Sequence, residues 1–195
     1  MKAMHIDDVL DRAHVVSLPL AVRFRGITTR EALLIDGPAG WGEFAPFLEY
    51  GPAESAAWLR AGLEAAYEGF PEPVRDSIEV NATIPAVPAS EVPAVVERYP
   101  GCRTFKIKVA EKGHTLADDA ARVHAVRDAV TQRGDIPILR VDANGGWSVD
   151  EAVEAAQMMM PLDYMEQPCA TTEELAQVRG RLMRAGLFVR VAADE

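Results

Sequence analysis

The second half of the sequence holds lysines and acidic residues whose spacing would bring them into one site. Lys106 and Lys108 lie two residues apart, so a strand over 104–109 directs both ammonium groups to one face and leaves apolar side chains on the other. Three later strand-like runs each end in a carboxylate: Asp142, Glu166 and Asp194. Counted from Lys106, the successive intervals are 36, 24 and 28 residues, each about one strand–helix unit. Parallel neighbouring strands would therefore present these side chains at the same carboxyl-terminal edge.

Three converging carboxylates without Cys or His among them are oxygen ligands for a hard cation. Mg²⁺ fits such a set best, and Mn²⁺ is the alternative. The site also leaves room for a substrate carboxylate. A metal that holds this group stabilises the enediolate that forms when the adjoining carbon loses a proton. We therefore expect Asp142, Glu166 and Asp194 to be metal ligands.

Proton removal also requires a base, and the lysine pair can supply one. A lysine beside a second ammonium and a divalent cation has its neutral form favoured. We expect Lys108, nearer the carboxyl end of its strand, to be the base and Lys106 to supply positive charge to the enediolate. Alone, the lysines fit an exposed edge strand, and the acids fit ordinary turns and strand exits. Four motifs in order at strand–helix spacing favour a site.

These side chains must be positioned by a repeated strand–helix pattern that starts near residue 78. Val80 to Ile84 is the first expected strand, and 90–99 is its helix. Helices expected over 116–132, 149–160 and 173–185 each begin with a capping pair: Thr115 with Asp118, Ser148 with Glu151, and Thr171 with Glu174. This is an α/β barrel pattern that stops at a fifth strand. A closed eight-stranded barrel needs about 250 residues, so we expect the sequence to be the amino-terminal part of a longer protein.

The first 78 residues follow a different pattern, a meander of strands and one helix. Strands are expected over 13–24, 31–36 and 41–47, and a helix over 53–68 that Gly69 ends. The proline-rich stretch 70–73 serves as a linker. We therefore expect an α+β domain over 1–78 and the barrel segment over 79–195.

Composition limits the class of partner. The chain of 195 residues carries a net charge of −10, which argues against nucleic acid and anionic membranes as partners. A small carboxylate substrate is expected instead, met by local positive charge. Cys102 and Cys169 have no metal-type spacing and are expected to be free thiols in a reducing compartment. Without an apolar leader or a membrane-length run, the expected location is the cytoplasm.

Four motifs together resemble the enolase superfamily, in the subgroup with a K-x-K lysine motif: Lys106-x-Lys108, Asp142-x-Asn144, Glu166-Gln-Pro168 and Ala193-Asp194-Glu195. The resemblance spans the whole chain. It implies an amino-terminal capping domain followed by a modified (β/α) barrel of the TIM type, of which this chain holds the first half. It also implies proton abstraction next to a carboxylate with the help of Mg²⁺.

Within the superfamily, the segments 23–31 and 40–47 are similar to o-succinylbenzoate synthases of actinobacterial type. This resemblance implies dehydration of 2-succinyl-6-hydroxy-2,4-cyclohexadiene-1-carboxylate to 2-succinylbenzoate, a step of menaquinone synthesis. It implies that Lys108 removes the proton, that Asn144 supports the ligands, and that Glu195 is the alternative third ligand. The family also has a lysine on the sixth strand, and the chain stops before it.

Loops of the capping domain are expected to close over the site and exclude water. The candidates are Arg25 and Gly26 in the segment 25–29, with Phe44 and Phe47 in the segment 44–47. Phe44 and Phe47 fit the core of their own domain equally well.

Two other functions remain open at this stage. An N-succinylamino acid racemase or another epimerase would use the same metal with a lysine on each face of the substrate. Alternatively, a truncated chain would keep the fold and bind Mg²⁺ or a full-length partner without turnover.

Overall fold

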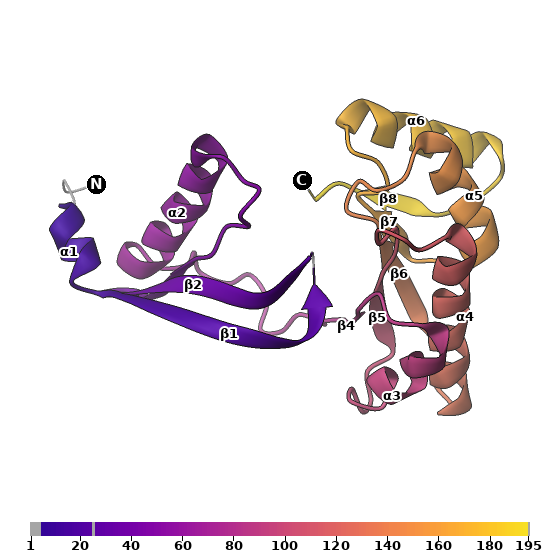
Figure 1. Cartoon of the computed structure of the whole chain (residues 1–195), viewed down its shortest axis with the longest axis horizontal. Helices are drawn as coiled ribbons and strands as arrows, with labels where there is room; N and C mark the ends of the chain where they lie inside the picture. Colours follow the sequence, from indigo (N-terminus) through magenta and orange to yellow (C-terminus); the bar gives the residue numbers. More distant parts are fainter. Residues whose placement is uncertain (1–4, 25, 195) are drawn as a thin grey trace. The chain divides into compact units, whose positions relative to one another are not determined.

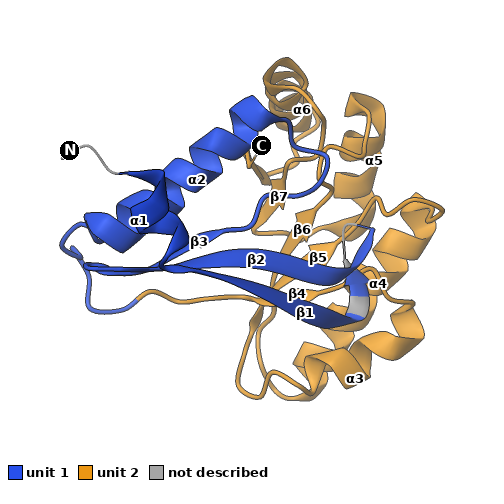
Figure 2. Ribbon diagram, turned by 60° about the vertical axis from the view of Figure 1, so that its left-hand side comes forward, with its two compact units in different colours: residues 1–77 blue, residues 78–195 orange. Residues whose placement is uncertain are grey.

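The computed structural model describes residues 5–24 and 26–194, and the chain forms two compact units, Met1–Ser77 and Ile78–Glu195 (Figure 1, Figure 2). Each unit has its own core, and each is described by itself.

The first unit is an antiparallel sheet with one long helix. Its strands are ordered β1-β2-β3, and its elements are α1 (Ile6–Leu10), β1 (Ala13–Phe24), β2 (Ile27–Gly37), β3 (Gly40–Phe44) and α2 (Pro52–Tyr67). Gly37 pairs with Gly40, so a two-residue turn joins β2 to β3. The strand expected over 31–36 begins earlier, at Ile27, because the β1–β2 hairpin is long. The strand expected to reach 47 ends at Phe44, and α1 was not expected.

Small residues let helix α2 approach the sheet closely. A Cβ atom on Gly42 would lie 1.9 Å from the carbonyl oxygen of Gly62, and one on Gly37 would lie 2.0 Å from that of Ala66. Larger side chains at Gly37 or Gly42 would push the helix away. The apolar cluster beneath the helix is built on three buried residues, Val9, Ile35 and Ala66.

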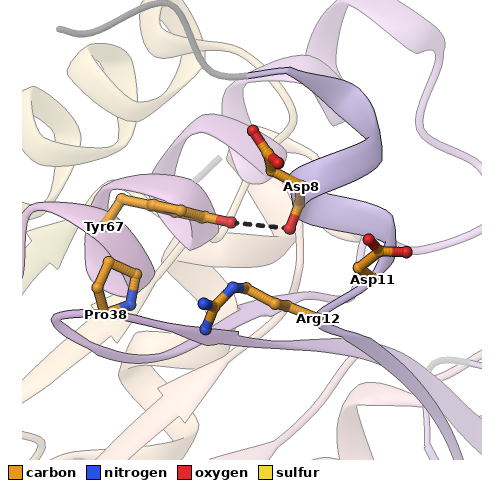
Figure 3. Close-up of a pocket in the computed structure, with 5 residues that line it drawn as sticks. All are labelled: Asp8, Asp11, Arg12, Pro38 and Tyr67. Carbon is orange, nitrogen blue, oxygen red and sulfur yellow. Dashed lines mark hydrogen bonds between the residues drawn. The ribbon is translucent and has the colours of Figure 1, made fainter.

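Helix α1 contacts the carboxyl end of α2 beside a pocket (Figure 3). The Tyr67 hydroxyl donates to the carbonyl oxygen of Asp8 at 3.4 Å, and Arg12 donates to the Asp36 carbonyl oxygen at 3.0 Å. The pocket is lined by Asp8, Asp11, Arg12, Pro38 and Tyr67. It contains none of the residues expected to do chemistry.

The second unit is a five-stranded parallel sheet in the order β4-β5-β6-β7-β8. Its helices cover one face of the sheet (Figure 1). The strands are β4 (Ala82–Ile84), β5 (Thr104–Lys108), β6 (Ile138–Asp142), β7 (Tyr164–Glu166) and β8 (Arg190–Ala192). The helical elements are η1 (Ala89–Glu91), α3 (Val92–Val96), α4 (Leu116–Gln132), α5 (Val149–Met159) and α6 (Thr172–Arg184). The predicted α/β class, with an α+β first part, is confirmed.

The three capping pairs are confirmed as reciprocal capping boxes at the starts of α4, α5 and α6. Other boundaries differ from expectation. The helix expected over 90–99 is a 3₁₀ turn followed by a helix that ends at Val96, ahead of the Pro100-Gly101 turn. Helix α5 stops at Met159 because Met160, which precedes a proline, is extended. Strand β6 ends at Asp142 as expected, whereas β8 ends at Ala192, two residues before Asp194.

No helix in the described part of the chain is long and apolar enough to cross a membrane.

Candidate active site

Strand β5 separates the two lysines from its apolar side chains, as the alternation predicts. Phe105 and Ile107 are buried beneath the helices, whereas Lys106 and Lys108 are half-buried on the opposite face. Lys108 pairs in register with Asp142 on β6, which in turn pairs with Glu166 on β7. Because residues in register on parallel strands share a face, these three side chains form one row across the sheet.

Both ammonium groups bind the carboxylates of this row. Lys106 Nζ contacts Glu166 Oε1 and lies 3.0 Å from Asp142 Oδ2. Lys108 Nζ lies 2.5 Å from the same Asp142 oxygen and donates to Asn144 Oδ1 at 2.6 Å. The structure therefore brings together both predicted lysines, two of the predicted carboxylates and the predicted supporting asparagine.

The lysines keep Asp142 ionised in a buried position. Burial alone would raise the pKa of Asp142, but the hydrogen bonds and charges of Lys108 and Lys106 outweigh it and lower the pKa below its ordinary value. The reverse holds for Lys106: burial would lower its pKa, and the hydrogen bonds and charges of Glu166 and Asp142 raise it. Asp142 and Lys106 thus each favour the charged form of the other.

A residue with positive φ follows each of the three central strands. The φ angle is 57° at Ala110, 45° at Asn144 and 37° at Gln167. Such left-handed backbone in a non-glycine residue is concentrated at functional sites, where surrounding contacts hold it. At Asn144 the contact is visible, because its backbone N–H donates to Asp142 Oδ1 at 3.0 Å.

The third predicted carboxylate, Asp194, is exposed after the end of β8. Its backbone N–H donates to Gln167 Oε1 at 2.8 Å, and the Gln167 amide donates to the Cys169 carbonyl oxygen at 3.0 Å. The buried Gln167 thus ties the chain after β8 to the loop after β7. Sequence reasoning gave no role to Gln167, and its only signal was its place in the Glu166-Gln-Pro168 motif. Glu195, the alternative ligand, lies outside the described residues.

Within residues 5–24 and 26–194, no three acidic, histidine or cysteine side chains converge closely enough to form a metal site. The donors nevertheless suit a hard cation. Asp142 and Glu166 offer oxygen atoms that both contact one positive group, the Lys106 ammonium. The assignment of Asp142, Glu166 and Asp194 as metal ligands therefore stays a prediction.

The expected capping-loop residues lie in the first unit. Arg25 is outside the described residues, and Gly26 is exposed in the β1–β2 turn, where its carbonyl oxygen accepts from Arg23 Nε at 3.0 Å. Phe44 and Phe47 are half-buried. The Phe47 ring packs edge-on against Tyr50 with 5.9 Å between centroids, and the Arg30 guanidinium lies 4.2 Å from the Phe47 centroid. Contact of these residues with a substrate stays a prediction.

A second ionic network, which the sequence did not reveal, crosses the amino-terminal ends of the strands. Arg140 Nε lies 2.9 Å from Asp163 Oδ2, and Arg140 Nη1 donates to Asn81 Oδ1 at 2.8 Å. Arg190 contacts the other oxygen of Asp163. The network thus connects four parts of the sheet: the residue before β4, strand β6, the residue before β7, and strand β8.

Two family models match the chain. The enolase N-terminal domain-like model matches residues 15–66, and the enolase C-terminal domain-like model matches residues 89–195.

A curated relative with high identity is the o-succinylbenzoate synthase of Mycolicibacterium smegmatis. It is 59% identical over 193 residues, which cover 97% of this chain and 57% of the relative. The chain spans a little over half the length of the curated relatives it matches.

Solved structures share the fold at lower identity. A substrate-liganded complex of the L-Ala-D/L-Glu epimerase from Bacillus subtilis is 24% identical with a TM-score of 0.71, covering 93% of this chain and 66% of the epimerase. A second solved structure is described as a mandelate racemase/muconate-lactonizing enzyme from Roseovarius nubinhibens complexed with magnesium. It is 20% identical with a TM-score of 0.63, and the match covers 94% of this chain and 64% of that enzyme.

Proposed function

Because this chain belongs to the enolase C-terminal domain-like family, we propose that it carries the lysine and carboxylate side of an o-succinylbenzoate synthase active site. The proposed reaction is the dehydration of 2-succinyl-6-hydroxy-2,4-cyclohexadiene-1-carboxylate to 2-succinylbenzoate, which belongs to menaquinone synthesis. The observation that carries the proposal is the row formed by Lys108, Asp142 and Glu166 across three adjacent strands. The relative from Mycolicibacterium smegmatis supports the choice of substrate.

In this proposal Lys108 moves the proton. In the neutral amine form, its Nζ takes the proton from the carbon that bears the substrate carboxylate, and the electron pair left behind forms the new ring double bond as the hydroxyl leaves. The same Nζ returns the proton to the hydroxyl, so the products are 2-succinylbenzoate and water. Asp142 Oδ2 and Asn144 Oδ1 lie 2.5 Å and 2.6 Å from Lys108 Nζ and would orient the lysine for this transfer.

Lys106 has a different proposed role. Its ammonium bridges Asp142 and Glu166, and the carboxylates that raise its pKa favour its charged form. A permanent positive charge at this point would stabilise negative charge that develops on the substrate carboxylate.

Asp142, Glu166 and Asp194 are the residues that would hold Mg²⁺, or Mn²⁺ in its place. When bound, the cation would supply positive charge for the substrate carboxylate, as hard divalent ions do. The fit rests on oxygen donors, on the ionised state of Asp142 and on the meeting of two carboxylates at one positive group.

Segments 25–29 and 44–47 would cover the substrate and exclude water. The partner is a small carboxylate, and the enzyme would act in the cytoplasm.

The test uses a completed protein, in which this chain is joined in frame to the carboxyl-terminal part of the Mycolicibacterium smegmatis relative that it does not cover. We expect this protein to dehydrate the cyclohexadiene substrate, monitored by appearance of the aromatic product, and to lose the activity in EDTA. Racemisation of N-succinylamino acids is assayed in parallel. Racemisation without dehydration, or full dehydration activity in EDTA, would contradict the proposal.

A further inference from the structure

Helix α4 contains a buried ion pair that the proposed chemistry does not use. Asp119 and Arg122 are each 1% exposed, and Arg122 Nη1 lies 2.7 Å from Asp119 Oδ1. Two charges in the interior are costly unless hydrogen bonds replace the lost water. Arg122 makes such bonds with Nε, which donates to the Val87 carbonyl oxygen at 2.6 Å, and with Nη2, which lies 2.8 Å from His114 Nδ1.

The other partners of the pair are backbone groups at the end of β5. Arg122 Nη1 donates to the Lys108 carbonyl oxygen at 3.0 Å, and the Ala110 backbone N–H donates to Asp119 Oδ2 at 2.8 Å. These two groups lie on either side of Val109. The ion pair therefore binds the carbonyl group of the proposed base, Lys108, and the N–H of Ala110, from the side of the sheet that the helices cover.

The end of β6 and the loop after it also contact Val109 and Ala110. The Val109 backbone N–H donates to the Asp142 carbonyl oxygen at 3.0 Å. Ala110, with φ of 57°, packs so closely on the loop after β6 that a Cβ atom on Gly146 would lie 2.8 Å from the Ala110 Cβ. A left-handed alanine is unfavourable by itself and persists only where contacts on several sides fix it.

We propose that Asp119 and Arg122 are positioning residues for Lys108. They fix the backbone on both sides of Val109, so that Lys108 Nζ stays between Asp142 and Asn144. This inference rests on the proposed function, since it concerns the lysine assigned there as the base. It explains why a costly buried ion pair faces the end of β5.

Four variants test the proposal. Asp119→Ala removes both the acceptor for Ala110 and the partner of Arg122, whereas Asp119→Asn keeps one oxygen acceptor but loses the charge opposite Arg122. Arg122→Lys keeps the charge beside Asp119 but lacks the forked donors that reach the Lys108 carbonyl oxygen at the same time. Val126→Ala is the matched control, because Val126 is buried one turn further along α4 and its truncation weakens packing alone.

One readout does not depend on the reaction. Amide hydrogen exchange in the 195-residue chain is followed by NMR at Ala110. We expect exchange to be about tenfold faster or more in Asp119→Ala than in Val126→Ala, and to lie between wild type and Asp119→Ala in Asp119→Asn. Equal exchange in Asp119→Ala and Val126→Ala would overturn the proposal. If Asp119→Ala does not fold, Arg122→Lys takes its place in the comparison.

The second readout is turnover by the completed protein, measured well below the melting temperature. We expect kcat to fall by about a hundredfold in Arg122→Lys with KM nearly unchanged, because displacement of a catalytic group on the ångström scale has effects of this size. Asp119→Asn should lose less activity than Asp119→Ala, because it keeps one oxygen acceptor. Equal kcat for Arg122→Lys and Val126→Ala would overturn the proposal. Absence of dehydration in the wild type would refute the proposed function, and the exchange comparison would still decide the positioning role.

Discussion

Lys108 Nζ and Asn144 Oδ1 lie 2.6 Å apart, and this bond joins the end of β5 to the loop that follows β6. Asn144 also donates its backbone N–H to Asp142, the carboxylate that Lys108 contacts. Lysine, asparagine and aspartate thus form a closed triangle of hydrogen bonds. The side chain of Lys108 has little freedom to turn away, which is the condition that proton transfer at a fixed carbon requires.

Replacement of Lys108 by arginine in the completed protein is expected to reduce kcat by about a thousandfold. Arginine keeps the positive charge but stays protonated near neutral pH, so it cannot accept a proton. The matched variant Lys106→Arg keeps the charge that we assign to that residue and should lose much less. The roles are reversed if Lys106→Arg proves the more damaging change, and Lys108 is not the base if its variant retains a tenth of the wild-type rate.

Asp142→Asn is expected to abolish Mg²⁺ binding by the completed protein, because it removes an ionised oxygen ligand. Isothermal titration calorimetry with MgCl₂ measures the binding. Asp163→Asn is the control, since Asp163 lies at the other end of the strands and pairs with arginines. An unchanged dissociation constant in Asp142→Asn would remove this residue from the ligand set.

Cys169 should resist alkylation in the folded chain. Burial, followed by the charges of Glu174 and Glu151, raises the pKa of its thiol to about 11, so the reactive thiolate is scarce near pH 8. Iodoacetamide with mass spectrometry should therefore label the half-buried Cys102 first, and Cys169 only after denaturation. Rapid labelling of native Cys169 would show that the loop after β7 opens.

The same shift predicts a loss of stability in alkaline solution. The unfolded thiol ionises near pH 9, whereas the folded thiol keeps its proton until the pH reaches its raised pKa of about 11. The contribution of Cys169 is therefore complete below pH 9 and declines as the pH rises toward 11. Urea unfolding of wild type and Cys169→Ala measures it. The difference in free energy of unfolding between the two chains should shrink between pH 8.5 and pH 10.5, values chosen to bracket that window.

Ser148→Ala should lower the free energy of unfolding by about 1 kcal/mol, the usual effect of losing a helix cap. The Ser148 backbone and hydroxyl donate to Glu151 and hold its pKa below the ordinary value. Glu151 therefore contributes stability above the ordinary carboxyl pKa and loses it as the pH falls through the lowered value. In Ser148→Ala, an NMR titration should find a higher pKa for Glu151. No change in this pKa would mean that the Ser148 hydroxyl does not donate to Glu151 in solution.

Much of the second unit follows from the sequence, because local rules determine it. The alternation in β5 assigns Lys106 and Lys108 to one face, and each capping box needs only residues three apart. The spacing of Asp142 and Glu166 was enough to align them, since parallel strands joined by one helix must end at the same edge.

The buried contacts between elements could not be read in this way. Asp119 and Arg122 sit on a helix that is rich in charge, where their spacing indicates an ordinary surface pair. Their burial depends on the carbonyl groups of Val87 and Lys108, which come from distant segments. Gln167 is similar, because its partner at Asp194 is brought near only by the pairing of β7 with β8.

The network of Asn81, Arg140, Asp163 and Arg190 has a consequence for protein engineering. It joins Asn81, Asp163 and Arg190, which lie at the amino-terminal ends of their strands, through Arg140 in the middle of β6, whereas Asp142 and Glu166 are the last residues of their strands. In barrels of this kind the amino-terminal face serves stability and the carboxyl-terminal face serves chemistry. A mutagenesis library confined to Asn81, Asp163 and Arg190 would therefore sample thermostability almost independently of catalysis, which makes these three positions a starting point for directed evolution of a more heat-resistant scaffold.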